Sequence, residues 1–316
     1  MDHEWLKTTI FIFIMTGLLI YICYKKKRTP PQWHGAKKTK RINNMKNDDL
    51  NYVNLIISPH LDDAVFSLGG LIAKEPQITK VVTIFSGAPS KPLIRIWDIC
   101  CGFKNSKEAL IKRIDENILA LCSLGINKQQ IINLQYVDNQ YRSSFLGLIK
   151  DSTLEEIEKS ILVEIELLIK NEGTRNLKIF APMSFTHKDH KMVHDILIKF
   201  YKNNTESNKK ICLYLYQDIP YFYSNYSKKI KRAVKSEEQI LNEMGPKISG
   251  YEREVIELTE EEFSKKREAS KLYGSQFVPI FSKLSSLIKI QYILSKKQTN
   301  ILHIKSPHCE IVYKLK

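Results

Sequence analysis

The segment Ser58-Pro59-His60-Leu61-Asp62-Asp63 places one imidazole and two carboxylates within four consecutive residues. It follows the apolar run 53–57, which is typical of a buried strand, and precedes a run with the character of a helix. In open α/β sheets, binding and catalytic side chains gather where a strand hands over to a helix. His60 and Asp63 can supply two ligands to a metal ion and leave Asp62 as a carboxylate beside it. The structural alternative is that one of the two aspartates only caps the helix.

A second polar cluster, His187-Lys188-Asp189-His190, follows another short apolar run at 177–180. The carboxyl ends of parallel strands meet at one edge of a sheet, so the two clusters are expected to lie together. His60, Asp63 and His190 would then give three ligands and an open position, the pattern of a catalytic zinc site. Asp62 remains as a general base, and His187 as a second acid or oxyanion donor.

Strand-like and helix-like runs alternate through the middle of the chain, which predicts an α/β fold. The expected architecture is Rossmann-like, with a mostly parallel sheet and helices on both faces. No G-x-G-x-x-G follows the first strand, so a dinucleotide-binding enzyme is not indicated. After about residue 235 the pattern is less regular, with a charged helix near 252–273 and an alternating apolar run at 309–313. The predicted strands are 53–57, 80–85, 130–135, 177–180 and 211–216, and the predicted helices are 64–73, 106–124, 154–170 and 189–202.

The amino-terminal part contains a charge-free apolar run at residues 8–24, followed by dense lysine and arginine. Such a run is at the short end of the length that crosses a bilayer. We therefore predict a transmembrane anchor at 1–24, a basic juxtamembrane linker at 25–50 and a catalytic domain at 51–316. The positive flank places that domain on the cytoplasmic side of a single-pass membrane protein. Part of the net charge of +15 lies in a dense basic cluster directly after the apolar run, which favours anionic lipids over nucleic acid as a partner.

Two motifs resemble those of the PIG-L (LmbE-like) family of zinc-dependent deacetylases, which act on substrates containing N-acetylglucosamine. The family signature P-H-P-D-D appears as Pro59-His60-Leu61-Asp62-Asp63, and its H-x-D-H appears as His187-Lys188-Asp189-His190. Leu61 replaces the usual proline. Further segments resemble the bacterial branch of the family, in the right order: 85–89, Arg113 in the helix ending at 124–125, 138–142, 216–221 and 273–276.

The resemblance implies a role for each matching residue. It assigns Zn2+ to His60, Asp63 and His190, and it makes Asp62 the general base. It makes His187 the residue that stabilises the tetrahedral oxyanion and Asp189 the residue that orients His187. Arg113 and Arg142 are expected to bind substrate, since a guanidinium suits a phosphate or a sugar hydroxyl. The alternative for Arg113 is an ordinary surface charge on a helix.

The sequence therefore predicts a zinc-dependent N-deacetylase that acts on an acetylated amino sugar, either lipid-linked or in a soluble conjugate. The alternative from another class is a non-catalytic sugar- or lipid-binding protein on the same fold. Such a protein is expected to have lost Asp62 or a zinc ligand, and none is lost. A nucleic-acid partner would rest on net charge alone and is not predicted. The oligomeric state and the identity of the acetylated substrate are not indicated by the sequence.

Overall fold

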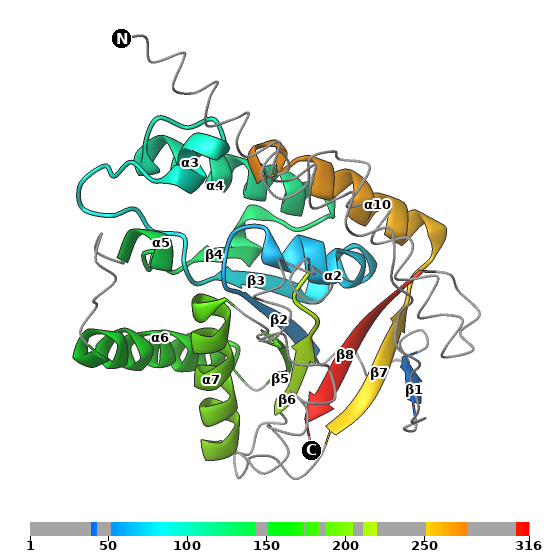
Figure 1. Cartoon of the computed structure of the whole chain (residues 1–316). Coiled ribbons are helices and arrows are strands. Elements are labelled where there is room, and N and C mark those ends of the chain that lie inside the picture. The colour runs from blue at the N-terminus through cyan, green and yellow to red at the C-terminus, as the bar shows by residue number, and fades with distance from the viewer. Residues whose placement is uncertain are drawn as a thin grey trace, which may run out of the picture. The chain divides into compact units, whose positions relative to one another are not determined.

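The computed structural model describes residues 39–42, 52–142, 151–173, 175–183, 187–204, 211–219, 251–276 and 308–315. Over these residues the chain forms an eight-stranded sheet with helices on both faces (Figure 1). The strands are β1 (Thr39–Ile42), β2 (Tyr52–Ser58), β3 (Thr79–Thr83), β4 (Ile131–Asn133), β5 (Asn176–Pro182), β6 (Ile211–Tyr216), β7 (Tyr251–Glu257) and β8 (Cys309–Leu315). The helices are α2 (Asp63–Lys74), α3 (Ile96–Cys100), α4 (Ser106–Ser123), α5 (Asn139–Arg142), α6 (Asp151–Asn171), α7 (Lys188–Asn203) and α10 (Glu260–Lys271), with short 3-10 turns at Pro76–Ile78 and Lys128–Gln130.

The sheet has the order β1-β7-β8-β6-β5-β2-β3-β4. The strands from β6 to β4 are parallel to one another, so their carboxyl ends lie along the same edge. Only β8 runs antiparallel among the described strands, and it lies between β6 and β7. The predicted fold class, a mostly parallel α/β sheet with helices on both faces, is confirmed.

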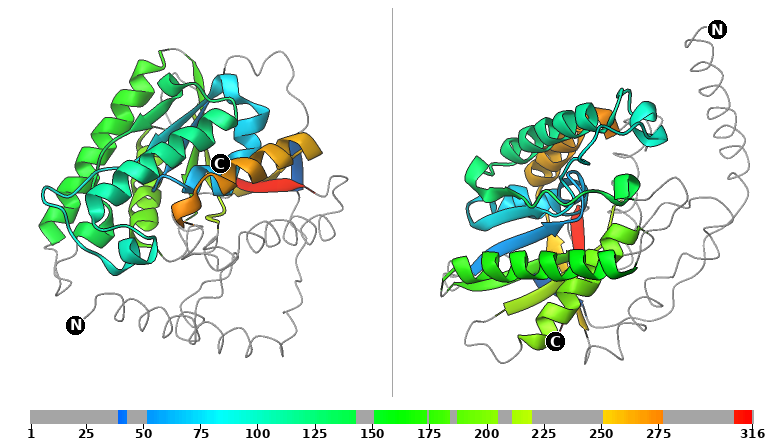
Figure 2. Two further views of the ribbon diagram at one scale, coloured as in Figure 1. Left: turned by 90° about the horizontal axis from the view of Figure 1, so that it is seen from above. Right: turned by 90° about the vertical axis from the view of Figure 1, so that its left-hand side faces the viewer.

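Two apolar clusters hold the layers together, one on each face of the sheet. Because side chains alternate along a strand, Leu55 and Ile57 of β2 face one cluster while Ile56 faces the other. The first cluster packs α6 and α7 on one face, and the second packs α2, α4 and α10 on the opposite face. Figure 2 shows the same two layers with the sheet between them. Strands buried on both faces explain why the central runs read as continuously apolar.

The predicted helix near 252–273 is replaced by strand β7 and the shorter helix α10. The boundary has a local physical cause. Thr259 caps α10 by accepting a hydrogen bond from the backbone N–H of Glu262, whose side chain accepts one from the backbone N–H of Thr259 in return. This reciprocal cap starts the helix at Glu260, and the preceding residues pair with β8 and with β1 instead.

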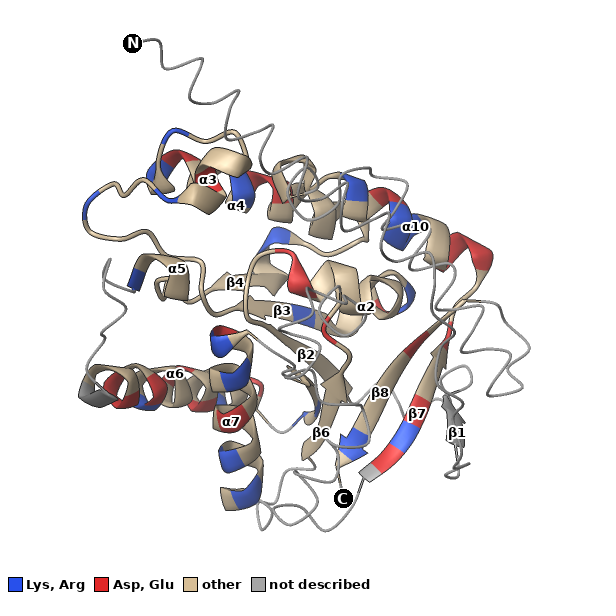
Figure 3. Cartoon of the chain, viewed as in Figure 1, with Lys and Arg blue, Asp and Glu red and all other residues tan. Residues whose placement is uncertain are grey.

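Among the described residues, no helix is both long and apolar enough to cross a membrane. This finding contradicts the predicted single-pass membrane localisation and gives no support to the predicted lipid partner. The run 8–24, on which both predictions depended, lies outside the described residues. Within the predicted linker, residues 39–42 form strand β1 and pair with β7. Both signs of charge occur along α6, α7 and α10 (Figure 3).

Candidate metal centre

The first cluster lies in the turn between β2 and α2, at the carboxyl edge of the sheet. Asp62 occupies the N-cap position of α2, but its side chain makes no capping hydrogen bond. The Ser58 hydroxyl accepts a hydrogen bond from the backbone N–H of Ala64, 3.1 Å away, at the start of the helix. The structural alternative, that one of the two aspartates only caps the helix, therefore fails for Asp62. Asp62, 7% exposed, keeps its carboxylate available at the site.

The three predicted metal ligands converge on one point. His60 Nδ1 lies 3.3 Å from Asp63 Oδ2 and 3.3 Å from His190 Nε2, and His190 Nε2 lies 3.1 Å from Asp63 Oδ2. All three residues are at most 5% exposed. Ligand atoms arranged tetrahedrally at about 2.0–2.1 Å from a zinc ion are about 3.3–3.4 Å apart, so this triangle fits a metal of that size.

A carboxylate stands behind each of the two histidines. Asp218, after β6, lies 2.9 Å from His190 Nδ1, and its other oxygen accepts the backbone N–H of Met183. Asp189 Oδ2 lies 3.2 Å from His60 Nε2. Each histidine can therefore donate a proton to a carboxylate from one ring nitrogen and direct the other nitrogen to the centre of the triangle.

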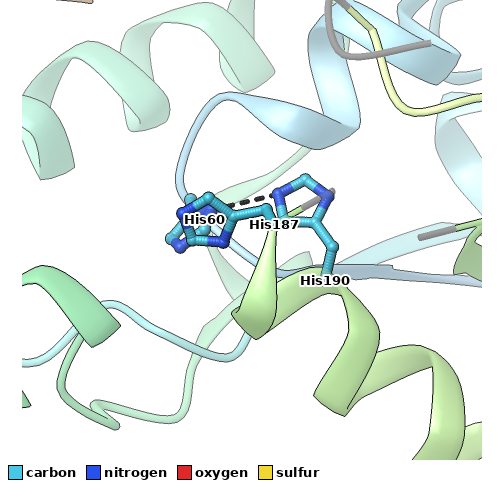
Figure 4. Close-up of side chains that lie close together, drawn as sticks. All are labelled: His60, His187 and His190. Atoms are coloured by element: carbon cyan, nitrogen blue, oxygen red, sulfur yellow. Dashed lines mark hydrogen bonds between the residues drawn. The ribbon is translucent and has the colours of Figure 1, made fainter. Parts of the chain in front are cut away.

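His187 stands over the same centre as the N-cap residue of α7 (Figure 4). Its ring centroid is 4.8 Å from that of His60 and 5.2 Å from that of His190. One ligand atom from each of these three histidines lies within 4.8 Å of the other two, so together they form a group that could hold a metal ion. His187 Nδ1 accepts a hydrogen bond from the backbone N–H of Asp189, which leaves the proton of the neutral ring on Nε2.

The structure changes the predicted role of Asp189. Its carboxylate contacts His60, the backbone N–H of Asn139 and Arg142, rather than the ring of His187. The cause is the helix geometry, since side chains two residues apart on a helix do not face each other. Asp189 therefore orients His60 through its side chain, whereas it meets His187 only through the backbone.

Asp62 and Arg113 face each other across the site, with Arg113 Nη2 3.8 Å from Asp62 Oδ1. The Arg113 side chain is 12% exposed, which excludes the alternative of a surface helix charge. Arg142 was also predicted to bind substrate, but it lies against the Asp189 carboxylate and over the ring of Phe85, 4.8 Å from its centroid. These contacts suit Arg142 to hold Asp189 rather than to meet a ligand directly.

The charges of these groups depend on one another. Burial and the neighbouring Asp63 raise the pKa of Asp62, and Arg113 partly offsets that rise. Burial would lower the pKa of His190, but Asp63 and Asp218 outweigh it and raise the pKa to about 9. Burial together with His60 and His190 lowers the pKa of His187 to about 4, so this ring is neutral at pH 7.

The site contains two further acids to which the sequence assigned no role. Asp218 backs His190, and Asp138 Oδ2 lies 3.6 Å from His60 Nε2. Asp138 also belongs, with His60 and Asp189, to a second group whose ligand atoms lie close together. Both segments were noted for their resemblance, but their position just beyond β6 and near the end of β4 is the signal that could have identified them. His194 makes no hydrogen bond with Asp138 or Asp218. Its Nδ1 instead lies 2.9 Å from the carbonyl oxygen of Pro182.

Residues 55–201 match the sequence model of the PIG-L family, described as GlcNAc-PI de-N-acetylase. This part of the chain is a PIG-L domain. The match includes every predicted site residue, whereas Asp218, β7, α10 and β8 lie beyond it. No curated protein matches the sequence.

Solved structures extend the similarity of fold beyond the PIG-L domain. The zinc-inhibited form of teicoplanin deacetylase Orf2 is 19% identical, with a TM-score of 0.65, covering 83% of this chain and 97% of the other. The A40926 pseudoaglycone deacetylase Dbv21 is 22% identical, with a TM-score of 0.61, covering 84% of this chain and 97% of the other. A deacetylase–teicoplanin complex is 19% identical, with a TM-score of 0.63, and the alignment covers 83% of this chain and 97% of the other. At these identities the likeness establishes the fold.

Proposed function

We propose that this protein is a zinc-dependent hydrolase that removes the acetyl group from an N-acetylglucosamine-type sugar in a glycolipid or sugar conjugate. The observation that carries the proposal is the buried triangle of His60, Asp63 and His190 with the carboxylate of Asp62 beside it. The family description and the similar deacetylase structures support the same reaction class.

His60, Asp63 and His190 would hold the zinc ion through one nitrogen, one oxygen and one nitrogen. The donor set fits zinc, because two imidazoles and one carboxylate with an open position are typical of catalytic zinc in hydrolases. When bound, the ion polarises the amide carbonyl and makes a water molecule more acidic. The carboxylates of Asp189 and Asp218 fix the ring orientation of the two histidine ligands.

Asp62 acts in the reaction as the base and then as the acid. It takes a proton from the attacking water as the new C–O bond forms, and it returns the proton to the amine nitrogen as the C–N bond breaks. Its raised pKa, caused by burial and Asp63, brings it closer to the operating pH and suits both steps. Arg113, the cation facing Asp62, keeps that carboxylate in place and can contact the substrate.

His187 faces the developing oxyanion with the proton on Nε2. Because burial, His60 and His190 lower its pKa to about 4, it donates as a neutral ring at pH 7. One such preorganised donor typically contributes about 3–4 kcal/mol to transition-state stabilisation. The alternative of a non-catalytic binding protein gains no support, since the chain retains Asp62 and the three residues proposed to hold the metal.

The experiment combines metal content, hydrolysis and one substitution. One of the similar structures is a zinc-inhibited form, so zinc is supplied at one equivalent to the metal-free full chain. Acetate release is then measured with a panel of acetylated glucosamine lipids, glycosides and oligosaccharides. We expect about one zinc per chain, and Asp62→Asn should retain the metal while hydrolysis falls by about 10²–10⁴-fold.

Asp115→Asn is the matched control, because it removes an exposed carboxylate from α4, the helix that also carries Arg113. It should leave both metal content and acetate release unchanged. A chain that takes up no zinc, or full hydrolysis by Asp62→Asn, would refute the proposal.

A further inference from the structure

Helix α2, which carries Asp62 and Asp63 at its amino end, is broken in the middle. Leu68 departs from helical backbone geometry, with φ −125° and ψ 22°. A break of this kind removes helical hydrogen bonds and leaves backbone N–H and C=O groups that need other partners. All of these groups are buried, so leaving them unpaired would be costly.

A buried ion pair from the carboxyl-terminal part of the chain supplies those partners. The two carboxylate oxygens of Glu310, in β8, accept the backbone N–H groups of Gly70 and Leu71, each at 2.8 Å. The Lys266 ammonium group, in α10, donates to the carbonyl oxygen of Ser67 at 3.1 Å and to Glu310 Oε1 at 2.6 Å. The carboxylate thus caps the second half of α2, and the ammonium caps the first.

The ion pair is buried: the Lys266 side chain is 4% exposed and the Glu310 side chain 3%. Buried ion pairs repay their desolvation only when further hydrogen bonds satisfy them, and here the broken helix supplies those bonds. The close approach depends on Gly70, because a Cβ there would lie 2.2 Å from Leu258 Cδ1 and 3.0 Å from Glu310 Oε1.

The first half of α2 links this pair to the metal centre. Ser67 is four residues after Asp63 and therefore lies on the same side of the helix. The Ser67 hydroxyl also accepts the backbone N–H of Ile219, next to Asp218, which holds His190. Such a short half-helix has little stability of its own, so its position depends on the groups that hold Ser67.

We propose that Lys266 and Glu310 are positioning residues that hold the first half of α2, and with it Asp62 and Asp63, in the geometry that the metal centre requires. The inference rests on the proposed function, and it assigns a role to α10 and β8, which lie outside the PIG-L match. The pair acts through α2 and does not contact the ligands directly.

The test measures zinc affinity by competition with a chelator, separately from hydrolysis, in full-length Glu310→Gln. We expect the apparent zinc Kd to rise by about 10-fold and kcat to fall by a similar factor, because misplaced supporting groups typically weaken metal sites by about 10–100-fold. KM should change less than twofold by the same argument, since the substituted residue touches no substrate. Hydrogen exchange should also quicken at Gly70 and Leu71 and at residues 62–67.

A double variant separates positioning from stability. Lys266→Met combined with Glu310→Gln removes the uncompensated buried charge, so its Tm should recover relative to Glu310→Gln alone. Zinc affinity should remain weak, because the Ser67 carbonyl oxygen has lost its donor and a single amide oxygen cannot replace both carboxylate oxygens at Gly70 and Leu71. Lys80→Met is the control: it breaks the ion pair with Glu172 at β3 and should leave zinc affinity unchanged.

Recovery of zinc affinity together with Tm in the double variant would overturn the positioning role, as would Glu310→Gln with unchanged zinc affinity. If the wild-type chain binds no zinc, the proposed function fails. In that case unchanged exchange at residues 62–67 in Glu310→Gln would also overturn the inference, whereas faster exchange there would support it.

Discussion

At the scale of single residues, the site depends on carboxylates that orient histidines. Asp218 and Asp189 each contact the ring nitrogen that faces away from the ligand triangle. A carboxylate in this place fixes the tautomer of the ring and raises its basicity, so it contributes to metal affinity without touching the metal. Asp189 is itself fixed by Arg142 and by the backbone N–H of Asn139.

Asp218→Asn tests the orienting role directly. Asp218 accepts two hydrogen bonds, from His190 and from the backbone N–H of Met183, and an asparagine offers only one oxygen for both. We expect metal affinity to fall by about 10–100-fold while the fold is retained. Chelator competition measures the change. Asp195→Asn, an exposed position on α7, loses the same charge and should bind metal as the wild type does; equal affinity of the two variants would argue against the role of Asp218.

The sequence allowed the three proposed ligands to be predicted to lie together, but not all of the groups that support them. The prediction that these residues lie together was possible because they come just after two parallel strands: His60 and Asp63 after β2, and His190 after β5. The motif alone could not predict which histidine the Asp189 carboxylate contacts, because its partner His60 follows a different strand. The position of Asp218 just beyond a strand was the signal available in the sequence, but that position does not show that its carboxylate reaches His190.

At the scale of elements, the loop after β4 brings Asp138 and Arg142 to the site, and Gly87 sets its position. Gly87 donates its backbone N–H to the Tyr136 carbonyl oxygen at 2.9 Å. A Cβ at Gly87 would lie 1.8 Å from the Gln135 carbonyl oxygen, a distance that no packing can accommodate. The two backbones therefore touch only because this position has no side chain.

Gly87→Ala should displace the loop that follows β4. Forcing a methyl group into such a contact costs about 1–3 kcal/mol of unfolding free energy. Because Asp138 and Arg142 move with the loop, acetate release should fall more than the loss of stability explains. Chemical denaturation and kcat at low temperature measure the two effects. Gly274→Ala is the control, since a Cβ there meets its nearest atom at an ordinary 3.9 Å; a similar loss in both variants would contradict the loop's role.

At the scale of the whole molecule, the alternating pattern was sufficient to predict the parallel part of the sheet and its two helical layers. It was not sufficient for the carboxyl-terminal part, where β7 was read as helix and β8 enters the sheet antiparallel. The contact between Glu310 and α2 joins residues 240 positions apart and has no local signal. Long-range pairing of this kind depends on where the strand is inserted, which periodicity does not specify.

The charges gathered in the assembled site also predict that metal binding releases protons and that metal affinity depends on pH. In the metal-free protein Asp63 and Asp218 overcome the effect of burial and raise the pKa of His190 to about 9, so the ring is protonated at pH 7.5. Metal binding requires the neutral ring, and it must therefore release that proton. The sign follows: apparent metal affinity rises with pH up to about 9 and falls, by about tenfold per pH unit for each proton released, as the solution becomes more acidic.

Calorimetric titration with zinc at pH 7.5, in two buffers of different ionisation enthalpy, measures the protons released. We expect at least about one proton per zinc ion for the wild-type chain. Asp218→Asn removes one of the two carboxylates that raise the pKa of His190, so the same titration should release fewer protons. Heats that do not depend on the buffer would show that His190 is already neutral before the metal arrives. The acidic pocket would then hold His190 through its hydrogen bond to Asp218 alone, and its excess of carboxylates would have no role in tuning metal affinity.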